Sequence, residues 1–293
     1  MTNLLSHKAT LASVSISGWS ARKLDRKESD DVNGKHGAKK DVARVNKLLV
    51  NKDRIDGINK IASAARQEVY RLTLPWVDDG SRILPNAMFM EFATMVRKFE
   101  TEYTEAADKF AADYPAMIEE AKRDRMGGMF VAADYPDPHC IRSKFSFRQK
   151  IFPCPDAADF RVDLAKEHMD DIRSELESQM KEALTEAMKA PVKRIIDVVG
   201  VICARLASYQ PATDEFQATR LYGSMVENVR DLVGLLPGFN LTGDKALTAI
   251  TDRMRKELII HTVEEMKDSP VIMKKVNKSA DSILAAAEKL MLA

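Results

Sequence analysis

Histidine is the side chain that most often transfers protons near neutral pH, and this 293-residue chain has five of them. They are scattered along the sequence at His7, His36, His139, His168 and His261. His139 and Cys140 supply two ligands at most, and no further ligand follows at the spacing of a zinc site. His168 and Asp171 form an i,i+3 pair on an expected helix, where such a pair usually faces water. The histidines therefore predict neither a catalytic base nor a metal site.

Carboxylates are the second source of chemistry in this sequence. Asp78 and Asp79 precede Gly80 and stand close to Arg82. An Asp-Asp-Gly sequence is typical of a tight turn, and Arg82 is then a salt-bridge partner rather than part of a catalytic pair. The chain has no HExxH, GxSxG or Walker sequence. We predict no catalytic residue and no cofactor, and we expect that the protein is not an enzyme, although carboxylates scattered in sequence leave a nuclease or hydrolase open.

The cysteines and the apolar runs indicate the compartment. Cys140, Cys154 and Cys203 are too few and too irregularly spaced for a disulfide framework, and we interpret them as buried thiols in a reducing compartment. The first residues lack the apolar core of a signal peptide. No run of about 18 apolar residues is long enough to span a membrane. The sequence thus predicts a cytoplasmic protein with no membrane partner.

Positive charge gathers near the amino terminus, although the whole chain has a formal charge of only +1. Residues 1–60 contain 13 Lys and Arg and 7 Asp and Glu, a net charge of +6. Cations could bind phosphates and an indole could stack on an unpaired base. The candidate nucleic-acid-binding residues are Trp19, Arg22, Lys23, Arg26, Lys27, Lys35, Lys39, Lys40, Arg44 and Lys47. The other interpretation is a solvated face, or a patch neutralised by an acidic part of the same chain or of a second copy.

The longest expected helix begins at Asp156, after two prolines, and extends to Leu206. Its first half carries an apolar stripe at steps of three and four, formed by Ala165, Met169, Ile172, Leu176, Met180, Ala183 and Ala187. Residues 156–190 contain ten acids and five bases, a net charge of −5. A narrow stripe with charged flanks suits a neighbouring helix, so we predict that it mediates self-association. Pro191 is expected to kink the helix before a more apolar second half.

The remaining pattern predicts a mainly α-helical fold. Alternation predicts a strand from Leu11 to Trp19 and a second, partner strand from Ile141 to Ile151. Helical spacing covers further segments, namely Asp41 to Leu72, Phe89 to Phe110 with an end at Pro115, Thr213 to Leu236, and Asp244 to Ala293 with a break at Pro270. We expect a multi-helix domain with a long kinked central helix and a small two-stranded β element. Its basic strand-and-helix region is residues 1–155 and its long-helix region is residues 156–293, packed as one unit.

Two strings of this sequence resemble those of a known group. They are S-G-W-S-A-R-K-L-D-R-K from Ser17 to Lys27 and L-P-W-V-D-D-G-S-R-I-L-P from Leu74 to Pro85. Both look like strings of uncharacterised helical proteins of tailed phages and other mobile elements, and the resemblance covers most of the chain. Some relatives are similar to products encoded beside MoxR-type AAA+ ATPases and von Willebrand-type proteins. The resemblance implies a bacterial host cell and an AAA+ ATPase as a candidate partner, and it carries over no catalytic residue.

These features predict a non-enzymatic assembly or adaptor protein of a phage or mobile element, which acts through protein contacts and forms a homo-oligomer. The alternative, from another class, is a nucleic-acid-binding accessory protein of DNA replication or recombination that uses the basic amino-terminal segment. An enzyme ranks third.

Overall fold

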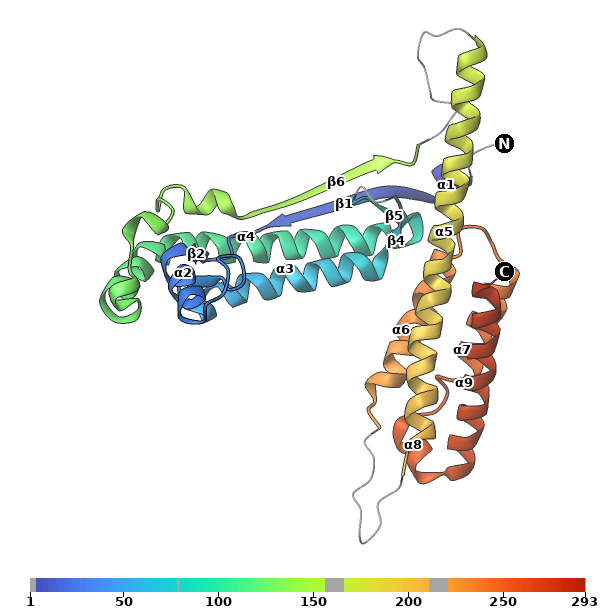
Figure 1. The fold of residues 1–293 in the computed structure, drawn as a ribbon. Coiled ribbons are helices and arrows are strands. Elements are labelled where there is room, and N and C mark those ends of the chain that lie inside the picture. Colours follow the sequence, from blue (N-terminus) through green and yellow to red (C-terminus); the bar gives the residue numbers. More distant parts are fainter. Residues whose placement is uncertain (1–3, 78–79, 156–165, 211–220, 293) are drawn as a thin grey trace. The chain divides into compact units, whose positions relative to one another are not determined.

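The computed structural model describes residues 4–77, 80–155, 166–210 and 221–292. Helices dominate it (Figure 1), and the short strands form one four-stranded and one two-stranded sheet. The expected fold class, mainly α with a long helix and a small β element, is confirmed. Contacts within the chain divide it into two compact units. We call them the bundle unit (residues 1–13, 72–90 and 151–293) and the two-helix unit (residues 14–71 and 91–150).

The bundle unit is built from helices whose apolar residues recur at helical steps. These helices are α5 (Lys166–Ala207), α6 (Ser224–Phe239), α7 (Lys245–Glu257), α8 (Val263–Asp268) and α9 (Pro270–Met291). Ile195, Val199 and Ile202 of α5 are buried in one core with residues of the other helices, such as Leu236 and Ile283. Ridges of side chains from each helix therefore fill a shared interior.

Capping side chains fix where the carboxy-terminal helices begin. Asp244 accepts hydrogen bonds from the first free amides of α7. Thr262 and Glu265 form a capping box at α8, and Ser269 caps α9 just before Pro270. A proline is tolerated in the first turn of a helix because its missing N–H has no helical partner there. The break expected at Pro270 is confirmed, and the structure adds an earlier one between α7 and α8.

Segments from the amino-terminal half of the chain also belong to the bundle unit. They form α1 (Leu4–Lys8), the first part of β1 (Ala9–Ser17), β4 (Leu74–Pro75) and β5 (Arg82–Pro85). Lys8 Nζ donates a hydrogen bond to the carbonyl oxygen of Leu241 at 2.9 Å. The guanidinium of Arg194, on α5, donates one to the carbonyl oxygen of Thr73 at 2.7 Å. These bonds tie short segments, which cannot form a core alone, to the helices of the unit.

The two-helix unit contains α3 (Lys52–Leu72) and α4 (Phe89–Glu120), apart from the few end residues assigned to the bundle unit. Its shorter elements are β2 (Arg22–Asp25), α2 (Arg26–Lys35), β3 (Val45–Leu48), a π turn (Ala121–Arg125), 3-10 turns (Gly127–Met129, Ala132–Asp134, Ile141–Lys144) and most of β6 (Ser146–Pro153). The aromatic stripe predicted for α4 does face inward, with Tyr103 and Phe110 buried against Ile55 and Ile58 of α3.

The expectation of a helix from Asp41 is wrong for its first eleven residues, 41–51. α3 begins only at Lys52, and Val45–Leu48 form β3, which pairs antiparallel with β2. The amide of Asp53 donates to the side chain of Asn51 at 3.3 Å, which satisfies one free amide of the first turn. Pairing with β2, from Arg22↔Leu48 to Asp25↔Val45, replaces local helical hydrogen bonds here. Helical spacing within the segment could not reveal that partner.

Prolines inside the long helices do not end them. α4 continues through Pro115, because Tyr114 and Met117 on either side of it are buried in the core and hold the helix in place. α5 likewise continues through Pro191. A proline within a helix removes one hydrogen bond and costs about 3 kcal/mol, which tertiary packing can offset. The expected helix starts at Asp156 and Thr213 lie outside the described residues.

The predicted pair of strands is present within a larger sheet. β1 confirms the first strand, and β6 lies beside it with the opposite direction (Figure 1). β6 begins at Ser146 because the preceding residues form a 3-10 turn. The sheet has four strands in the order β4-β5-β1-β6, since the connection between α3 and α4 supplies two strands and not only turns.

Candidate functional site

The amino-terminal half of α5 carries the stripe predicted to mediate self-association. Ala165 and the side chain of Met169 lie outside the described residues. Of the other stripe residues, Ile172, Leu176, Met180 and Ala183 are half-buried and Ala187 is buried. Among the described residues, the core cluster that α5 shares with the other carboxy-terminal helices includes α5 residues only from position 188 onward, whereas buried residues such as Ala187 and Leu74 pack elsewhere in the bundle unit. The stripe from 172 to 183 therefore lies outside that core.

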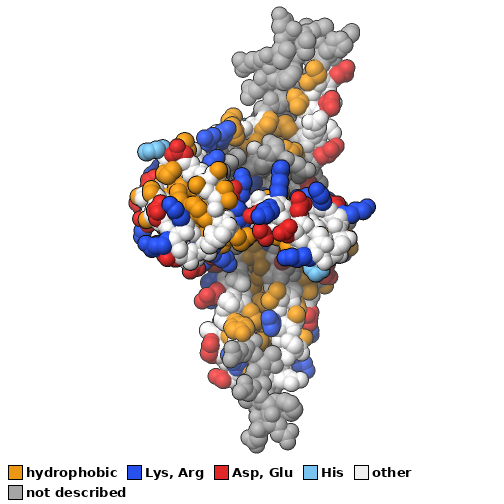
Figure 2. Space-filling model, turned by 60° about the vertical axis from the view of Figure 1, so that its left-hand side comes forward, with side chains coloured by type: hydrophobic (Ala, Val, Ile, Leu, Met, Phe, Trp, Pro, Cys, Tyr) orange, Lys and Arg blue, Asp and Glu red, His pale blue; other side chains and the backbone are white. Residues whose placement is uncertain are grey.

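Acidic side chains flank the stripe, as predicted. Figure 2 shows red carboxylates beside hydrophobic side chains along the upper, described part of α5. Glu175 accepts a hydrogen bond from Gln179 at 3.2 Å, and Glu182 accepts one from Ser178 at 3.2 Å. These i,i+4 contacts support the helix locally and leave the carboxylates exposed. This half of α5 is thus a helix with one apolar face and an acidic, solvated border.

The predicted basic segment does not form one surface. Side chains alternate along a strand, so Arg22 and Lys23 of β2 point to opposite faces. Arg22 lines a groove beside Trp19, whereas Lys23 lines a separate hollow with Lys47. The remaining candidates are exposed on α2 or in the loop after it, and they are Arg26, Lys27, Lys35, Lys39, Lys40 and Arg44. Arg26 and Lys27 also line the hollow.

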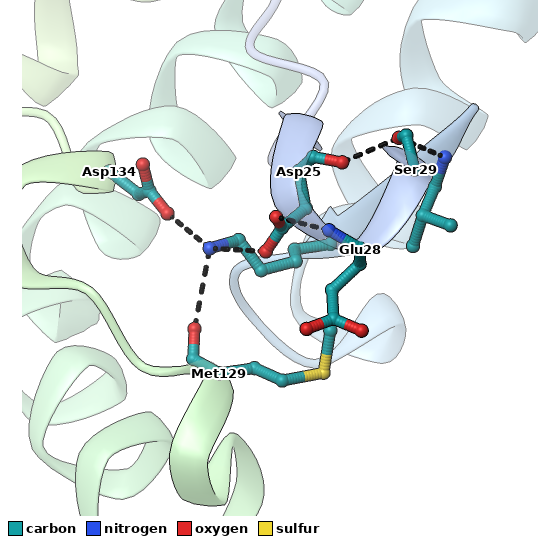
Figure 3. Close-up of polar contacts among 7 residues, drawn as sticks. Asp25, Glu28, Ser29, Met129 and Asp134 are labelled. Atoms are coloured by element: carbon teal, nitrogen blue, oxygen red, sulfur yellow. Dashed lines mark hydrogen bonds and ion pairs between the residues drawn. The ribbon is translucent and has the colours of Figure 1, made fainter. Parts of the chain in front are cut away.

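Lys47 is the most buried of the predicted cations, with 5% of its side chain exposed. Figure 3 shows the cluster around it. Its Nζ lies 3.1 Å from a carboxylate oxygen of Asp25 and 2.6 Å from one of Asp134, and it donates to the carbonyl oxygen of Met129 at 3.3 Å. The hydrogen bond to Asp134 is the main reason that the pKa of Lys47 is raised. Lys47 is therefore engaged in holding β3, β2 and the 127–134 loop together.

Asp25 has two roles at the same point. It caps α2 by accepting a hydrogen bond from the amide of Glu28 at 3.2 Å, and it pairs with Lys47. The amide of Glu28, followed by Lys47, lowers the pKa of Asp25. The hydroxyl of Ser29 donates to the carbonyl oxygen of Asp25 and accepts from the amide of Val45 at 2.9 Å. The cluster therefore has a structural role, in which the ammonium group of Lys47 pairs with the carboxylates of Asp25 and Asp134.

The groove beside Trp19 has a volume of about 390 Å³ and runs along one face of α3. Its cations are Arg22, Lys52 and Arg66, and its one carboxylate is Asp56. Trp19 is half-buried, with its ring centre 6.1 Å from that of Phe110 and 5.5 Å from that of Tyr114, both edge-to-face. The indole is therefore held in a fixed position, which contrasts with a side chain free to reach into solvent.

Three groove residues are not among the candidates predicted from the sequence, although their spacing could have indicated them. Lys52, Asn59 and Arg66 recur at steps of seven along α3, which places them on one side of the helix two turns apart. The candidate cations predicted from the sequence extend only from Arg22 to Lys47, so they do not include these three residues.

The residues considered for chemistry lie apart from one another. Cys154 and Cys203 are buried and half-buried, and burial raises the pKa of each thiol to about 11, so neither is a ready nucleophile. Cys140 is exposed, which corrects its interpretation as a buried thiol. Within the described residues, no group of three or more His, Cys, Asp and Glu could hold a metal ion. Asp78 and Asp79 lie outside those residues.

Comparisons of the chain with protein-family models, with curated proteins and with solved structures found no match. No helix in the described ranges is long and apolar enough to cross a membrane.

Proposed function

We propose that this protein is a non-enzymatic assembly or adaptor protein that acts through protein contacts, and that its first partner is a second copy of itself. The observation that carries the proposal is the amino-terminal half of α5. That segment extends beyond the core cluster shared by the carboxy-terminal helices, with an apolar stripe that is half-buried from Ile172 to Ala183 and an acidic border. An amphipathic helix of this kind typically binds by laying its apolar face in a groove of a partner.

The chain itself contains a surface that is complementary to that helix. A hollow of about 640 Å³ in the two-helix unit exposes apolar side chains at its border: Leu24 is 40%, Met129 39% and Val131 47% exposed. Exposed apolar residues grouped around a hollow are typical of interaction sites.

The charges of the hollow also fit an acidic helix. Four cations, Lys23, Arg26, Lys27 and Lys47, line it against three carboxylates, Asp25, Glu28 and Asp134, which gives a net charge of +1, and the cations other than Lys47 are exposed. The two-helix unit as a whole has 24 Lys and Arg and 19 Asp and Glu, a net charge of +5. Opposite charge on two surfaces accelerates their encounter and selects their orientation.

We therefore propose that α5 of one copy binds the hollow of the next copy. Because the two surfaces differ, the contact is heterologous, and repeated contacts of this type generate rings or filaments. Such an assembly supports a structural role, and the resemblance to proteins of tailed phages and mobile elements supplies the proposed setting. An AAA+ ATPase is the proposed further partner on the basis of the same resemblance.

Charge reversal on each surface tests the proposal. We expect that Glu175→Lys with Glu182→Lys abolishes self-association in sedimentation velocity across a concentration series, and that Lys23→Glu with Lys27→Glu does the same. Mixing the two double variants should restore a complex, because the reversed charges are again opposite.

A matched control is Asp281→Lys with Glu288→Lys, which reverses two exposed acids at the same spacing on α9. We expect this variant to associate like the wild type. A wild-type protein that stays monomeric at every concentration contradicts self-association, and variants that fail to complement each other contradict the pairing of these two surfaces.

A further inference from the structure

The groove along α3 has an excess of positive charge that no described residue neutralises. The side chain of Arg22 has no carboxylate partner among the described residues. The guanidinium of Arg66 donates to the carbonyl oxygen of Ile16 at 2.8 Å, which leaves its charge unpaired. Lys52 lies 3.8 Å from Asp56, at the limit of an ion pair, and 72% of its side chain is exposed. Three cations against one carboxylate give the groove a net charge of +2.

We infer that this groove binds single-stranded nucleic acid, with the phosphates along the cations and a base against Trp19. The inference rests on different residues from the proposed self-association. It also goes beyond the basic amino-terminal segment, because Lys52, Asn59 and Arg66 come from α3 and only Trp19 and Arg22 come from that segment.

The length of the groove favours a polymer over a single nucleotide. Lys52 and Arg66 stand 14 residues apart on α3, which corresponds to about 21 Å along the helix. A chain of several nucleotides fills that distance, and its repeated phosphates match cations placed at both ends. Proteins that bind single strands combine a positive groove of this kind with aromatic side chains on which bases stack.

The walls of the groove are rigid where a base would be bound. Trp19 is fixed by its contacts with Phe110 and Tyr114. Gly18 brings the chain against Tyr103, since a Cβ at this position would lie 3.1 Å from the tyrosine oxygen. That hydroxyl donates to the carbonyl oxygen of Ser17 at 2.6 Å, which fixes the end of β1.

The polar and aromatic side chains of the groove favour nucleic acid over an acidic peptide as its ligand. Asn59, which is exposed in the groove, offers both donors and acceptors to a base edge. An indole gives a stacking surface that every base can use and that aspartate or glutamate side chains cannot. The combination therefore favours an unpaired polynucleotide.

Binding is tested with a fluorescein-labelled oligothymidylate of about 15 nucleotides, a length within the range that such grooves cover. In fluorescence anisotropy, we expect the full-length protein to bind it with an affinity that falls as salt rises. Arg22→Gln with Arg66→Gln should weaken binding at least about tenfold and reduce the slope of log affinity against log salt by about 1.4, for two lost phosphate contacts.

The matched control is Lys39→Gln with Lys40→Gln, which removes two exposed charges of the basic segment outside the groove. We expect this variant to bind like the wild type. Equal losses in the two double variants would mean that binding is a general effect of charge, and this result overturns the inference.

Fluorescence of Trp19 gives a readout that does not depend on those variants. In a Trp76→Phe protein, Trp19 is the remaining tryptophan, and oligothymidylate should quench it through stacking. Absence of quenching on binding contradicts the role of Trp19. Competition by polyglutamate as strong as that by unlabelled oligothymidylate would point to an acidic peptide, and competition by thymidine monophosphate at equal phosphate concentration would point to a mononucleotide site. Either result overturns the inference.

Discussion

The two units hold their long helices by different means. In the bundle unit, α5 is fixed by an apolar face, on which Ile195 and Val199 are fully buried, against α6, α7 and α9. In the two-helix unit, an aromatic core is joined to irregular segments by buried polar contacts. Lys47 bridges two carboxylates there, and the hydroxyl of Tyr135 donates to the carbonyl oxygen of Leu49 at 3.0 Å.

The two units differ because their backbone N–H and C=O groups find hydrogen-bond partners in different ways. Within a helix, the N–H and C=O groups satisfy one another, so apolar packing alone can fix its position. The segment from 121 to 145 is a series of short turns, in which only part of the backbone N–H and C=O groups bond to one another, so side chains supply further partners and fix its path. We therefore expect apolar truncation to matter most in the bundle unit and polar substitutions to matter most in the two-helix unit.

The largest expected effect is loss of packing in the bundle unit. Ile195→Ala should reduce the free energy of unfolding by about 3 kcal/mol, because it leaves a cavity in a core that cannot fully collapse. Val201→Ala on the same helix is the control, since Val201 is 52% exposed, and it should change the free energy by less than about 0.5 kcal/mol. Urea unfolding followed by circular dichroism measures both, and equal effects would break the comparison.

The next effect is loss of the buried cation in the two-helix unit. Lys47→Met keeps much of the side-chain volume but leaves Asp25 and Asp134 without their partner, and we expect a loss of about 2–3 kcal/mol. Lys23→Met, at the residue opposite Lys47 on β2, should change stability little because Lys23 is exposed. Trp19 fluorescence in a Trp76→Phe background follows this unit alone. An unchanged midpoint for Lys47→Met contradicts the structural role of the cluster.

The same cluster predicts a pH dependence with a defined sign. The pKa of Asp25 is lowered from 3.8, so its contribution to stability is present above pH 3.8 and is lost as the pH falls through the folded-state pKa. The pKa of Lys47 is raised from 10.5, so its contribution is present below pH 10.5 and is lost as the pH rises through the folded-state pKa. Unfolding midpoints across pH should decline at both ends, and Lys47→Met should flatten the alkaline decline. A variant that keeps the full decline contradicts this assignment.

The smallest expected effects come from single hydroxyl groups. Tyr135→Phe removes the donor to Leu49 and leaves a buried carbonyl oxygen without it, which should cost about 1 kcal/mol. The hydroxyl of Tyr114 is buried without a hydrogen-bond partner in the described structure, so Tyr114→Phe should be neutral or slightly stabilising. Paired urea titrations compare the two variants. A larger loss for Tyr114→Phe would show that its hydroxyl has a bonding role.

The sequence predicts the regular part of this fold well, because periodic apolar residues are a local signal. The aromatic face of α4, the break at Pro270 and the neighbouring strands β1 and β6 are all confirmed. Helical spacing predicts a helix around Val45–Leu48, and this prediction is wrong because the strand partner at residues 22–25 is a non-local feature. The joining of residues 1–13 to the carboxy-terminal helices is non-local in the same way.

The candidate surfaces were predictable only in part. The count of charged residues predicts the basic segment. It does not distinguish Lys47, which forms ion pairs with two carboxylates, from Arg22, which forms none among the described residues. That distinction depends on Asp134, which lies 87 residues away from Lys47 and enters the cluster only through folding. Local spacing alone predicts the apolar stripe of α5 and its acidic flanks, whereas only the structure shows that residues 172–183 lie outside the core cluster of the carboxy-terminal helices.

Hydrogen exchange as a function of protein concentration tests the proposed assembly most directly. Protection of the amides of residues 172–183 on α5, and of residues 23–28 at the hollow, should rise together as concentration increases. Amides of residues 195–202 in the bundle core should exchange at the same rate throughout. Exchange of residues 172–183 that is identical at every concentration would contradict the account.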